Sequence, residues 1–368
     1  MFKNYRQKIA ASIAAGDKYD VYEKHFRDYK DYLEDLLLEQ PYNTAALCQL
    51  GMVYLELREY GTKSISLLKR VLKDSEQHFS DTDKAQIYTN LAALYGMEMH
   101  QPKQEALYLK KALALCPNPL LDEKLGIACV DLGKDEEALA SFKQAWQTEP
   151  SSQNSYHYAL MLAILGQYQK ALANLPAINA NPEKDVVSHL SYYLKAFCLA
   201  KTGELEEASA MTDELVLLDE KAQELVYDFI AESEMADIYY LYGKYAKHNK
   251  MYDTSKIRYY YDASWLGCYF DSLYKLGDQE GLQLYYQKVR QEKLERLQQI
   301  QADDYSQVEG GEAARQDYLQ SIQEELAKIQ NVYQQVLAQK FVAQIKCAQP
   351  FLRNCYYTDC PRHSKELS

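Results

Sequence analysis

The sequence predicts an all-α protein built from repeated pairs of helices. Glycine and proline, the two residues that disfavour helix interiors, number only 14 and 9 among the 368 residues. No sustained valine-rich run alternates apolar and polar residues, as half-buried strands do. Instead, one order of small residues, bulky apolar residues and a turn glycine returns along the chain at a nearly constant step, which indicates stacked helices.

The clearest copy of this pattern is residues 122–150. It contains small residues, bulky apolar residues, a turn glycine and a final proline: Gly126, Ala138 and Ala145; Leu125, Leu132 and Phe142; Gly133; Pro150. Small residues let two antiparallel helices approach closely, and the bulky residues fill the space between them. The glycine supplies the turn, and the proline ends the second helix.

The pattern recurs with turn glycines Gly133, Gly166 and Gly203, which are 33 and 37 residues apart. This order of residues resembles the tetratricopeptide repeat, a helix-turn-helix unit of about 34 residues. Asp122 stands where the family often has tryptophan, and Cys129 where it has tyrosine. The resemblance implies a right-handed α-solenoid, and the sequence accommodates about seven helix pairs.

The chain divides into four expected regions. Residues 1–40 form a helical cap or a degenerate repeat, residues 41–290 form the solenoid, residues 291–346 form a long helical hairpin or coiled coil, and residues 347–368 form an irregular cysteine-containing tail. The repeats are clearest up to about residue 220 and have irregular lengths beyond it.

The hairpin is predicted from its apolar spacing. Six apolar residues follow one another at steps of 3, 4, 3, 4 and 3: Leu319, Ile322, Leu326, Ile329, Tyr333 and Val336. This is the a/d seam of a coiled coil. Two such segments joined at Gly310-Gly311 favour an antiparallel hairpin, with self-association through the coil as the alternative.

Composition limits the classes of partner. A formal charge of −12 and an isoelectric point near 5.2 disfavour nucleic acid and anionic membranes, which both reward a basic surface. No run reaches transmembrane length, and the N-terminus is a poor signal peptide. Cys48, Cys129 and Cys198 occupy positions suited to small apolar residues, so we expect free thiols and a cytoplasmic location.

The resemblance also implies binding of a protein or peptide in the groove formed by the first helix of each pair. The residues expected to face that groove are Met52, Leu55, Ile127, Val130, Tyr156, Leu160, Ala163, Tyr193, Phe197 and Ala200. This row is apolar, and it lacks the Lys and Asn residues that would clamp a terminal carboxylate. It would therefore accept an apolar peptide or an amphipathic helix, unless the chain buries the row against itself.

Tyrosine is unusually frequent, with 34 residues against 9 phenylalanines, and many lie between residues 239 and 286. A tyrosine ring packs like an apolar group while its hydroxyl stays polar, which suits half-buried packing as well as recognition surfaces. Most of these residues are expected to pack in the interior. We add Tyr240 to the candidate protein-binding residues.

The tail contains the only candidate metal ligands, Cys347, Cys355, Cys360 and His363. Thiolates and imidazole bind zinc, but the spacing C-x7-C-x4-C-x2-H lacks a C-x2-C pair, and free thiols in a loop are the alternative. The sequence carries none of the nucleotide-binding, zinc-protease or serine-hydrolase motifs we sought. We therefore expect no enzymatic activity and no cofactor.

These observations favour a scaffold or adaptor that binds a partner peptide or helix in an apolar and aromatic groove. A peptide-responsive regulatory protein is the alternative, and a zinc-dependent or other enzyme is the third hypothesis. The fold alone does not choose among them.

Overall fold

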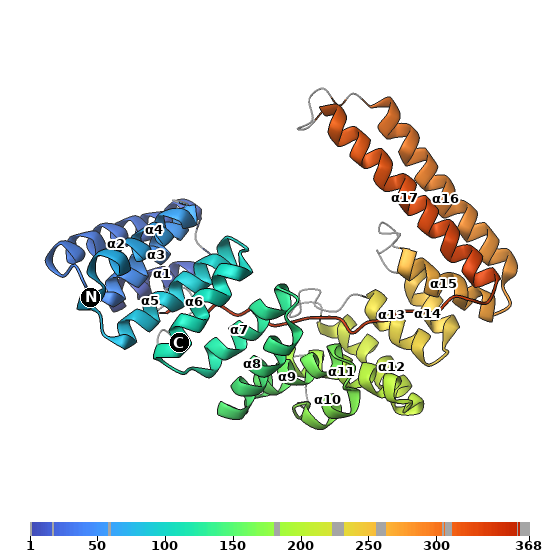
Figure 1. The fold of residues 1–368 in the computed structure, drawn as a ribbon, viewed down its shortest axis with the longest axis horizontal. Coiled ribbons are helices and arrows are strands. Elements are labelled where there is room, and N and C mark those ends of the chain that lie inside the picture. Colours follow the sequence, from blue (N-terminus) through green and yellow to red (C-terminus); the bar gives the residue numbers. More distant parts are fainter. Residues whose placement is uncertain are drawn as a thin grey trace. The chain divides into compact units, whose positions relative to one another are not determined.

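The computed structural model describes residues 2–16, 18–57, 60–179, 185–222, 232–254, 263–303, 305, 311–358 and 360. These residues form α-helices joined by short turns, with no strand among them (Figure 1). The chain divides into two compact units. Unit 1 comprises residues 1–161 and 351–368, and unit 2 comprises residues 162–350.

Unit 1 contains successive antiparallel helices: α1 (Phe2–Ala14), α2 (Tyr19–Glu39), α3 (Thr44–Glu56), α4 (Tyr60–Ser75), α5 (Asp81–Ala93), α6 (Pro102–Leu115), α7 (Pro119–Asp131), α8 (Asp135–Thr148) and the start of α9 (Ser152–Ile164). Each helix from α2 to α8 packs against the next, apart from α4 and α5, which also share contacts with α3. Side chains of Asn43, Ser80 and Asn118 accept backbone hydrogen bonds at the starts of α3, α5 and α7.

Unit 2 contains the end of α9 and the remaining helices: α10 (Tyr168–Asn174), α11 (Val186–Thr202), α12 (Leu205–Ala222), α13 (Glu232–Leu241), α14 (Tyr245–Thr254), α15 (Ala263–Lys275), α16 (Gln279–Ala302) and α17 (Gly311–Leu337). Within this unit α11 packs on α12, α13 on α14, and α15 on both α16 and α17. Together the two units hold the seven expected helix pairs, from α3/α4 to α15/α16, within the described residues.

Five turns share one hydrogen-bond geometry. Gly133, Gly166, Gly203, Gly243 and Gly277 all have positive φ, between 66° and 91°. In each turn the residue after the glycine donates its N–H to a carbonyl five residues earlier, at 2.8 to 3.0 Å, as Lys134 does to Cys129. This is the hydrogen bond of a Schellman cap, and glycine enters its left-handed conformation without a steric cost. The predicted turn glycines are therefore confirmed as equivalent.

The predicted close approach of helices is clearest between α7 and α8. A Cβ atom at Gly126 would lie 2.6 Å from Cε1 of Phe142, which is shorter than any ordinary contact. Phe142 is 1% exposed and Ala145 is likewise buried. Gly126 thus permits the spacing that the bulky phenylalanine then fills.

The N-terminal region consists of two helices rather than one. Ile9 on α1 and Phe26, Tyr29 and Leu33 on α2 are fully buried and form one cluster with residues of α3, including Leu50. These helices cover the exposed side of the first pair. Such a cap is what a stack of repeats requires at its end.

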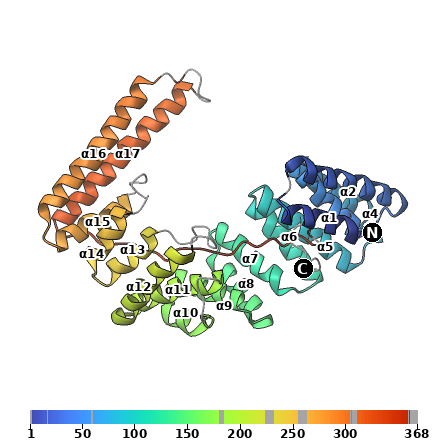
Figure 2. The same ribbon diagram turned by 180° about the vertical axis from the view of Figure 1, so that it is seen from behind.

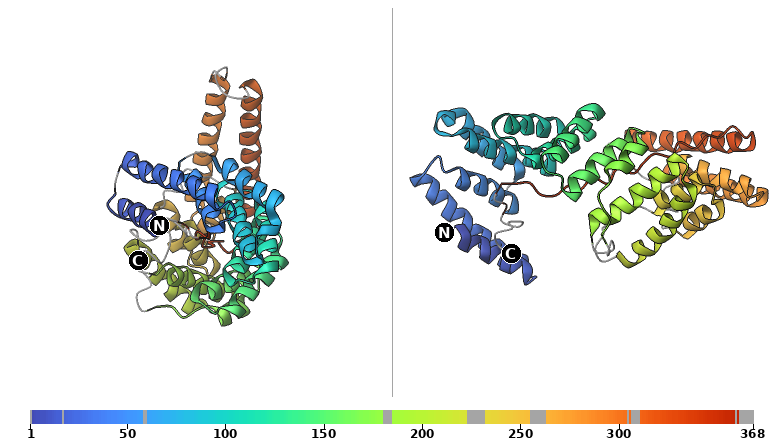
Figure 3. Two further views of the ribbon diagram at one scale, coloured as in Figure 1. Left: turned by 90° about the vertical axis from the view of Figure 1, so that its left-hand side faces the viewer. Right: turned by 90° about the horizontal axis from the view of Figure 1, so that it is seen from below.

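The hairpin is formed by α16 and α17, which lie side by side in every view (Figures 1, 2 and 3). Ile322, Ile329 and Val336 of the predicted seam are buried, and Ile329 and Val336 pack with residues of α15 and α16. The other seam residues, Leu319, Leu326 and Tyr333, are partly buried. The seam is therefore occupied largely within the chain itself.

The helix boundaries differ from those expected around residue 290. α16 starts at Gln279 and runs without interruption to Ala302, so it serves both as the second helix of the seventh pair and as the first arm of the hairpin. No proline occurs between these residues, and Asp278 caps the helix at its start. α17 ends at Leu337, and residues 340–350 are extended rather than helical.

None of the helices in the described part of the chain is both long enough and apolar enough to cross a membrane.

Candidate functional site

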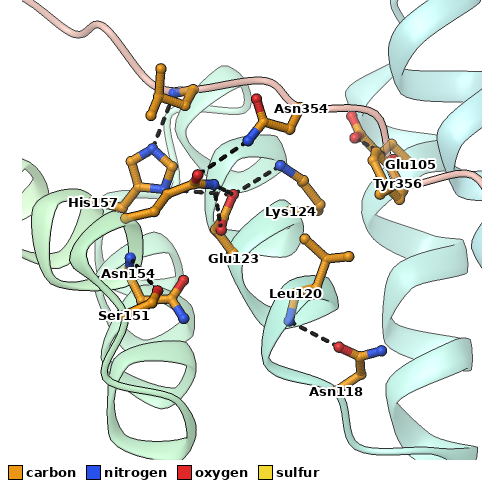
Figure 4. Close-up of polar contacts among 12 residues, drawn as sticks. Glu105, Asn118, Leu120, Glu123, Lys124, Ser151, Asn154, His157, Asn354 and Tyr356 are labelled. Atoms are coloured by element: carbon orange, nitrogen blue, oxygen red, sulfur yellow. Dashed lines mark hydrogen bonds and ion pairs between the residues drawn. The ribbon is translucent and has the colours of Figure 1, made fainter. Parts of the chain in front are cut away.

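The C-terminal tail lies against the helices of unit 1. Residues 351–358, here called the tail segment, form no regular secondary structure and follow the inner helices of that unit (Figure 4). Phe351 anchors the segment, because its ring stacks on Phe142 at 5.2 Å between centroids and lies 5.6 Å from the ring of His157. Phe351 and Leu352 are each 7% exposed.

Two groove side chains bind the backbone of the tail segment. The Leu352 N–H donates to Nε2 of His157 at 3.0 Å, and the Thr358 N–H donates to Oδ1 of Asn90 at 2.7 Å. His157 lies on α9 and Asn90 on α5. The tail segment therefore runs against the order of the repeats, from the fourth pair back to the second.

The side chains of the tail segment make polar contacts between these two points. Arg353 forms a bidentate ion pair with Asp131, with N–O distances of 2.9 and 2.6 Å. Asn354 Nδ2 donates to Oε1 of Gln153 at 3.1 Å. The arginine side chain is 54% exposed, so solvent screens this pair and it adds little to stability.

Two tyrosines end the described contacts. The Tyr356 hydroxyl donates to Oε1 of Glu105 at 2.7 Å, and the Tyr357 hydroxyl donates to Oε1 of Glu98 at 3.3 Å. Burial raises the pKa of Glu105, and the hydrogen bond from Tyr356 opposes that rise. Burial together with the nearby carboxylates raises the pKa of both tyrosines, so their hydroxyls stay protonated donors.

A buried polar cluster supports the tail segment from below. Lys124 Nζ lies 2.8 Å from Oε1 of Glu123, and the two side chains are only 3% and 4% exposed. Gln153 Nε2 donates to both oxygens of Glu123 at 3.1 and 3.0 Å, which connects Asn354 to the ion pair. A buried pair of this kind is costly to break, since the remaining charge would be unpaired.

His157 is neutral in this arrangement. Its Nε2 accepts a hydrogen bond, so the proton of the neutral ring is on Nδ1, which lies 3.6 Å from Oε1 of Glu123. Burial and the charge of Lys124 lower the pKa of His157 to about 3. Protonation at Nε2 would replace the acceptor of the Leu352 N–H with a second donor.

A cavity of about 450 Å³ remains between the tail segment and the groove. Its lining includes Ile127, Lys124 and Asp131 from α7, together with Arg353 and Tyr356 from the tail segment. The tail segment therefore does not fill the groove of unit 1 completely.

Unit 2 contacts the residues that precede the tail segment. The Ala348 N–H donates to the hydroxyl of Tyr193 at 3.0 Å, and Lys201 Nζ donates to the Ile345 carbonyl at 2.9 Å. Tyr193 also stacks with Phe197 at 6.1 Å between ring centroids. The inner helix α11 of unit 2 thus holds its own stretch of extended chain.

The candidate binding residues lie in both units. Met52, Leu55, Ile127, Val130, Tyr156 and Leu160 belong to unit 1, and Tyr193, Phe197 and Tyr240 belong to unit 2. Leu55 and Val130 are partly exposed, and the other seven are buried. Ala163 and Ala200 are buried as well.

Tyr240 is packed within unit 2. Its hydroxyl donates to Oδ2 of Asp271, and its ring lies below Nζ of Lys275 at 5.3 Å. Tyr239 and Tyr269 likewise donate to Asp213 and Asp253. Each of these hydroxyls is satisfied inside the unit, as expected for tyrosines that pack.

The sequence interpretation missed the polar residues of the groove. Asn90, Lys124 and His157 occupy one repeat position, directly before Leu91-Ala92, Leu125-Gly126 and Tyr158-Ala159. The inner surface therefore includes Asn and Lys residues, although it was expected to be apolar. Their recurrence at the repeat step is the sequence signal that could have identified them.

The cysteines are unbridged, and the suggested zinc ligands do not form one group among the described residues. Cys347 belongs to unit 2, whereas Cys355 and Cys360 belong to unit 1, where a hydrogen bond from Cys360 raises the pKa of Cys355. No group of three or more metal-binding side chains occurs in the part of the chain that is described. His363 lies outside the described residues.

Comparisons with solved structures give three similar helical proteins. A tetratricopeptide repeat protein from Parabacteroides merdae is 18% identical and matches 67% of this chain and 91% of its own, with a TM-score of 0.49. Naa15/Naa10 bound to HypK-THB is 13% identical over 92% of this chain and 52% of that one, with a TM-score of 0.36. The P58(IPK) TPR domain is 16% identical over 90% and 93%, with a TM-score of 0.27.

No family model and no curated protein matches the chain. The three TM-scores are below 0.5, so the fold is assigned from the helix pairs, the five equivalent turns and the close α7/α8 contact. The fold is of the tetratricopeptide type. The groove described above is accordingly the inner surface of a tetratricopeptide-type stack in unit 1.

Proposed function

We propose that this protein is a scaffold that binds a segment of another protein along the inner helices of unit 1. The observation that carries the proposal is the pair of backbone hydrogen bonds to Leu352 and Thr358. Backbone N–H groups are present in every protein segment, so a groove that binds them in its own tail is suited to a foreign chain.

The occupant that this groove suits is extended rather than helical. A helix uses its own N–H groups internally, whereas the tail segment offers two of them to side chains of the groove. Apolar anchoring comes from the Phe142 ring, and charged groups such as Asp131 and Glu105 add polar contacts. Affinity would follow from burial and shape at the anchor, with the polar contacts setting orientation.

A peptide-responsive regulator is the second candidate. The observation that favours it is the tail itself, since displacing it would alter contacts in unit 1 without any chemical step. Neither candidate assigns a catalytic role to His157, which serves as a hydrogen-bond acceptor. The eight unbridged cysteines, four of them buried on helices, support a reducing compartment such as the cytoplasm.

The test is site-specific photo-crosslinking in host cells with the full-length chain. A photoreactive amino acid replaces Val130, which is partly exposed on inner helix α7, and a matched variant replaces Leu284, which is 59% exposed on α16. We expect position 130 to crosslink to another protein and position 284 to give far less of that product. Crosslinks from position 130 to the chain's own tail alone would contradict the proposal.

A further inference from the structure

Unit 1 carries a polar residue at the same position of four successive repeats. These residues, here called the polar series, directly precede the pairs Leu50-Gly51, Leu91-Ala92, Leu125-Gly126 and Tyr158-Ala159; they are Gln49, Asn90, Lys124 and His157. His157 and Asn90 accept backbone hydrogen bonds from Leu352 and Thr358. Lys124 Nζ lies 6.0 Å from the ring centroid of Tyr356.

The first member of the polar series has no ligand among the described residues. Gln49 is 1% exposed, and its Oε1 is buried without a hydrogen-bond partner there. A buried amide oxygen without a donor is unfavourable, so its presence calls for an explanation. The three equivalent side chains all contact an extended chain, which indicates that Gln49 is a further position of the same binding surface.

The spacing of the contacts agrees with this interpretation. Leu352 and Thr358 are six residues apart and bind residues two repeats apart. An extended chain rises about 3.3 Å per residue, so three residues cover about 10 Å, close to the separation of packed helices. A segment that continued about three residues past the place of Thr358 would bring an N–H group toward Gln49.

We propose that the groove of unit 1 binds an extended partner segment of the same chemistry as the tail segment, and that the tail competes with it. This inference rests on the proposed function. The partner would present an aromatic–aliphatic pair, then an arginine, then tyrosines, and would run from His157 toward Asn90. It would extend beyond the tail segment to Gln49.

The contacts of the tail segment are compatible with displacement. Arg353 and Asp131 are 54% and 32% exposed, and no covalent bond holds the segment in place. The tail has the advantage of being attached to the same chain, which acts as a high effective concentration. A partner overcomes that advantage through the additional position at Gln49.

The experiment measures binding of a fluorescent peptide with the sequence of residues 348–358 to the full-length chain under reducing conditions. The tail of the chain is weakened by Phe351→Ala and Arg353→Glu together, and Arg296→Glu on exposed α16 is the control for charge. We expect the weakened-tail chain to bind the peptide at least about tenfold more tightly than the wild type and the control do. Equal affinities would overturn the competition.

Two modified peptides test the mode of binding. N-methylation at Leu352 removes the hydrogen bond to His157, and a peptide of reversed sequence keeps the composition but loses the direction. Both should bind at least about tenfold more weakly to the weakened-tail chain, since each loses specific polar contacts. Unchanged binding of either peptide would contradict recognition of a directed backbone.

A charge exchange provides a second, independent route if the weakened-tail chain does not fold. Asp131→Arg alone changes one surface residue of the groove and repels Arg353 of the tail. The peptide with Arg353→Glu should then bind this variant more tightly than the unmodified peptide does, and the preference should reverse for the weakened-tail chain. The absence of any such preference would place the peptide outside this groove.

The position of Gln49 is tested with a peptide that has three alanines after Thr358. The longer peptide should bind the weakened-tail chain more tightly than the shorter one, and Gln49→Leu should remove that gain without affecting the shorter peptide. A gain that persists in Gln49→Leu would contradict the extended site. If the peptides fail while a partner still crosslinks at position 130, the partner chemistry is wrong and the scaffold function stands; if both fail, both are wrong.

Discussion

At the residue scale, the contact between Gly126 and Phe142 links the repeat to the tail. The small residue could be predicted from the sequence because it recurs at the repeat step. The stacking of Phe351 on the other side of Phe142 could not, because those residues are far apart along the chain. The same side chain therefore supports the helix pair and anchors the tail segment.

We predict that Gly126→Ala destabilises unit 1. Alanine favours a helix more than glycine does, but its Cβ would lie 2.6 Å from the buried Phe142 ring, so we expect a net loss of about 1–3 kcal/mol. Gly51→Ala is the control, since its Cβ would meet only contacts at 3.9 Å and should be neutral or stabilising. Urea unfolding followed by Trp146 fluorescence in a Trp265→Phe background measures both.

We predict that acid weakens docking of the tail segment through His157. Its pKa is about 3 with the tail docked and should approach the ordinary 6.5 once the tail leaves, so release favours proton uptake. Docking is therefore fully stable above pH 6.5 and weakens as pH falls from 6.5 toward 3. At pH 5 the loss is about 2 kcal/mol.

The pH dependence is measured by hydrogen–deuterium exchange of the tail segment in wild type and in His157→Gln, which retains an acceptor without titrating. Glu105 acts in the opposite direction, because its raised pKa favours docking as pH falls, and Glu105→Gln removes that contribution. Identical pH profiles for wild type and His157→Gln would contradict the role assigned to His157.

At the scale of elements, the hairpin depends on contacts between its inner side and α15. Ile329 is 1% exposed and lies in a cluster with Leu266 and Val289, whereas Leu284 on α16 is 59% exposed. The a/d spacing correctly identified the long helix. It did not fix where the first arm begins, because α16 continues the seventh helix pair without a break.

We predict that Ile329→Ala lowers the stability of unit 2 by about 2–4 kcal/mol, because it leaves a cavity in a packed cluster. Leu284→Ala should change stability by no more than about 0.5 kcal/mol, as expected for an exposed site. Trp265 fluorescence in a Trp146→Phe background follows unit 2 during unfolding. Equal effects of the two substitutions would mean that the hairpin does not pack as described.

At the scale of the whole molecule, the chain leaves unit 1 within α9 and contributes to it again from Phe351 onward. The sequence predicted the helix pairs because each is a local pattern that repeats. It did not predict the docked tail, since Leu352 and His157 are 195 residues apart and the tail has no periodicity. Self-burial of the inner row was an open alternative, and the tail contributes to that burial in each unit.

Burial also changes which substitutions are informative. Leu160 and Phe197 are 0% and 1% exposed, so aspartate at either position would introduce an unpaired buried charge and destabilise the fold. Substitutions at exposed groove residues such as Asp131 separate binding from folding more cleanly. The sequence alone could not make that distinction, because it shows the face of a helix but not what covers it.

The central claim is that the tail segment occupies the groove of unit 1 through its backbone. Residue-resolved hydrogen–deuterium exchange of the full-length chain tests it most directly. The amide hydrogens of Leu352 and Thr358 should exchange at least about tenfold more slowly in the wild type than in the chain with Phe351→Ala and Arg353→Glu, since docking protects both. Exchange of both amides at the rate of an unstructured peptide in the wild type would contradict the account.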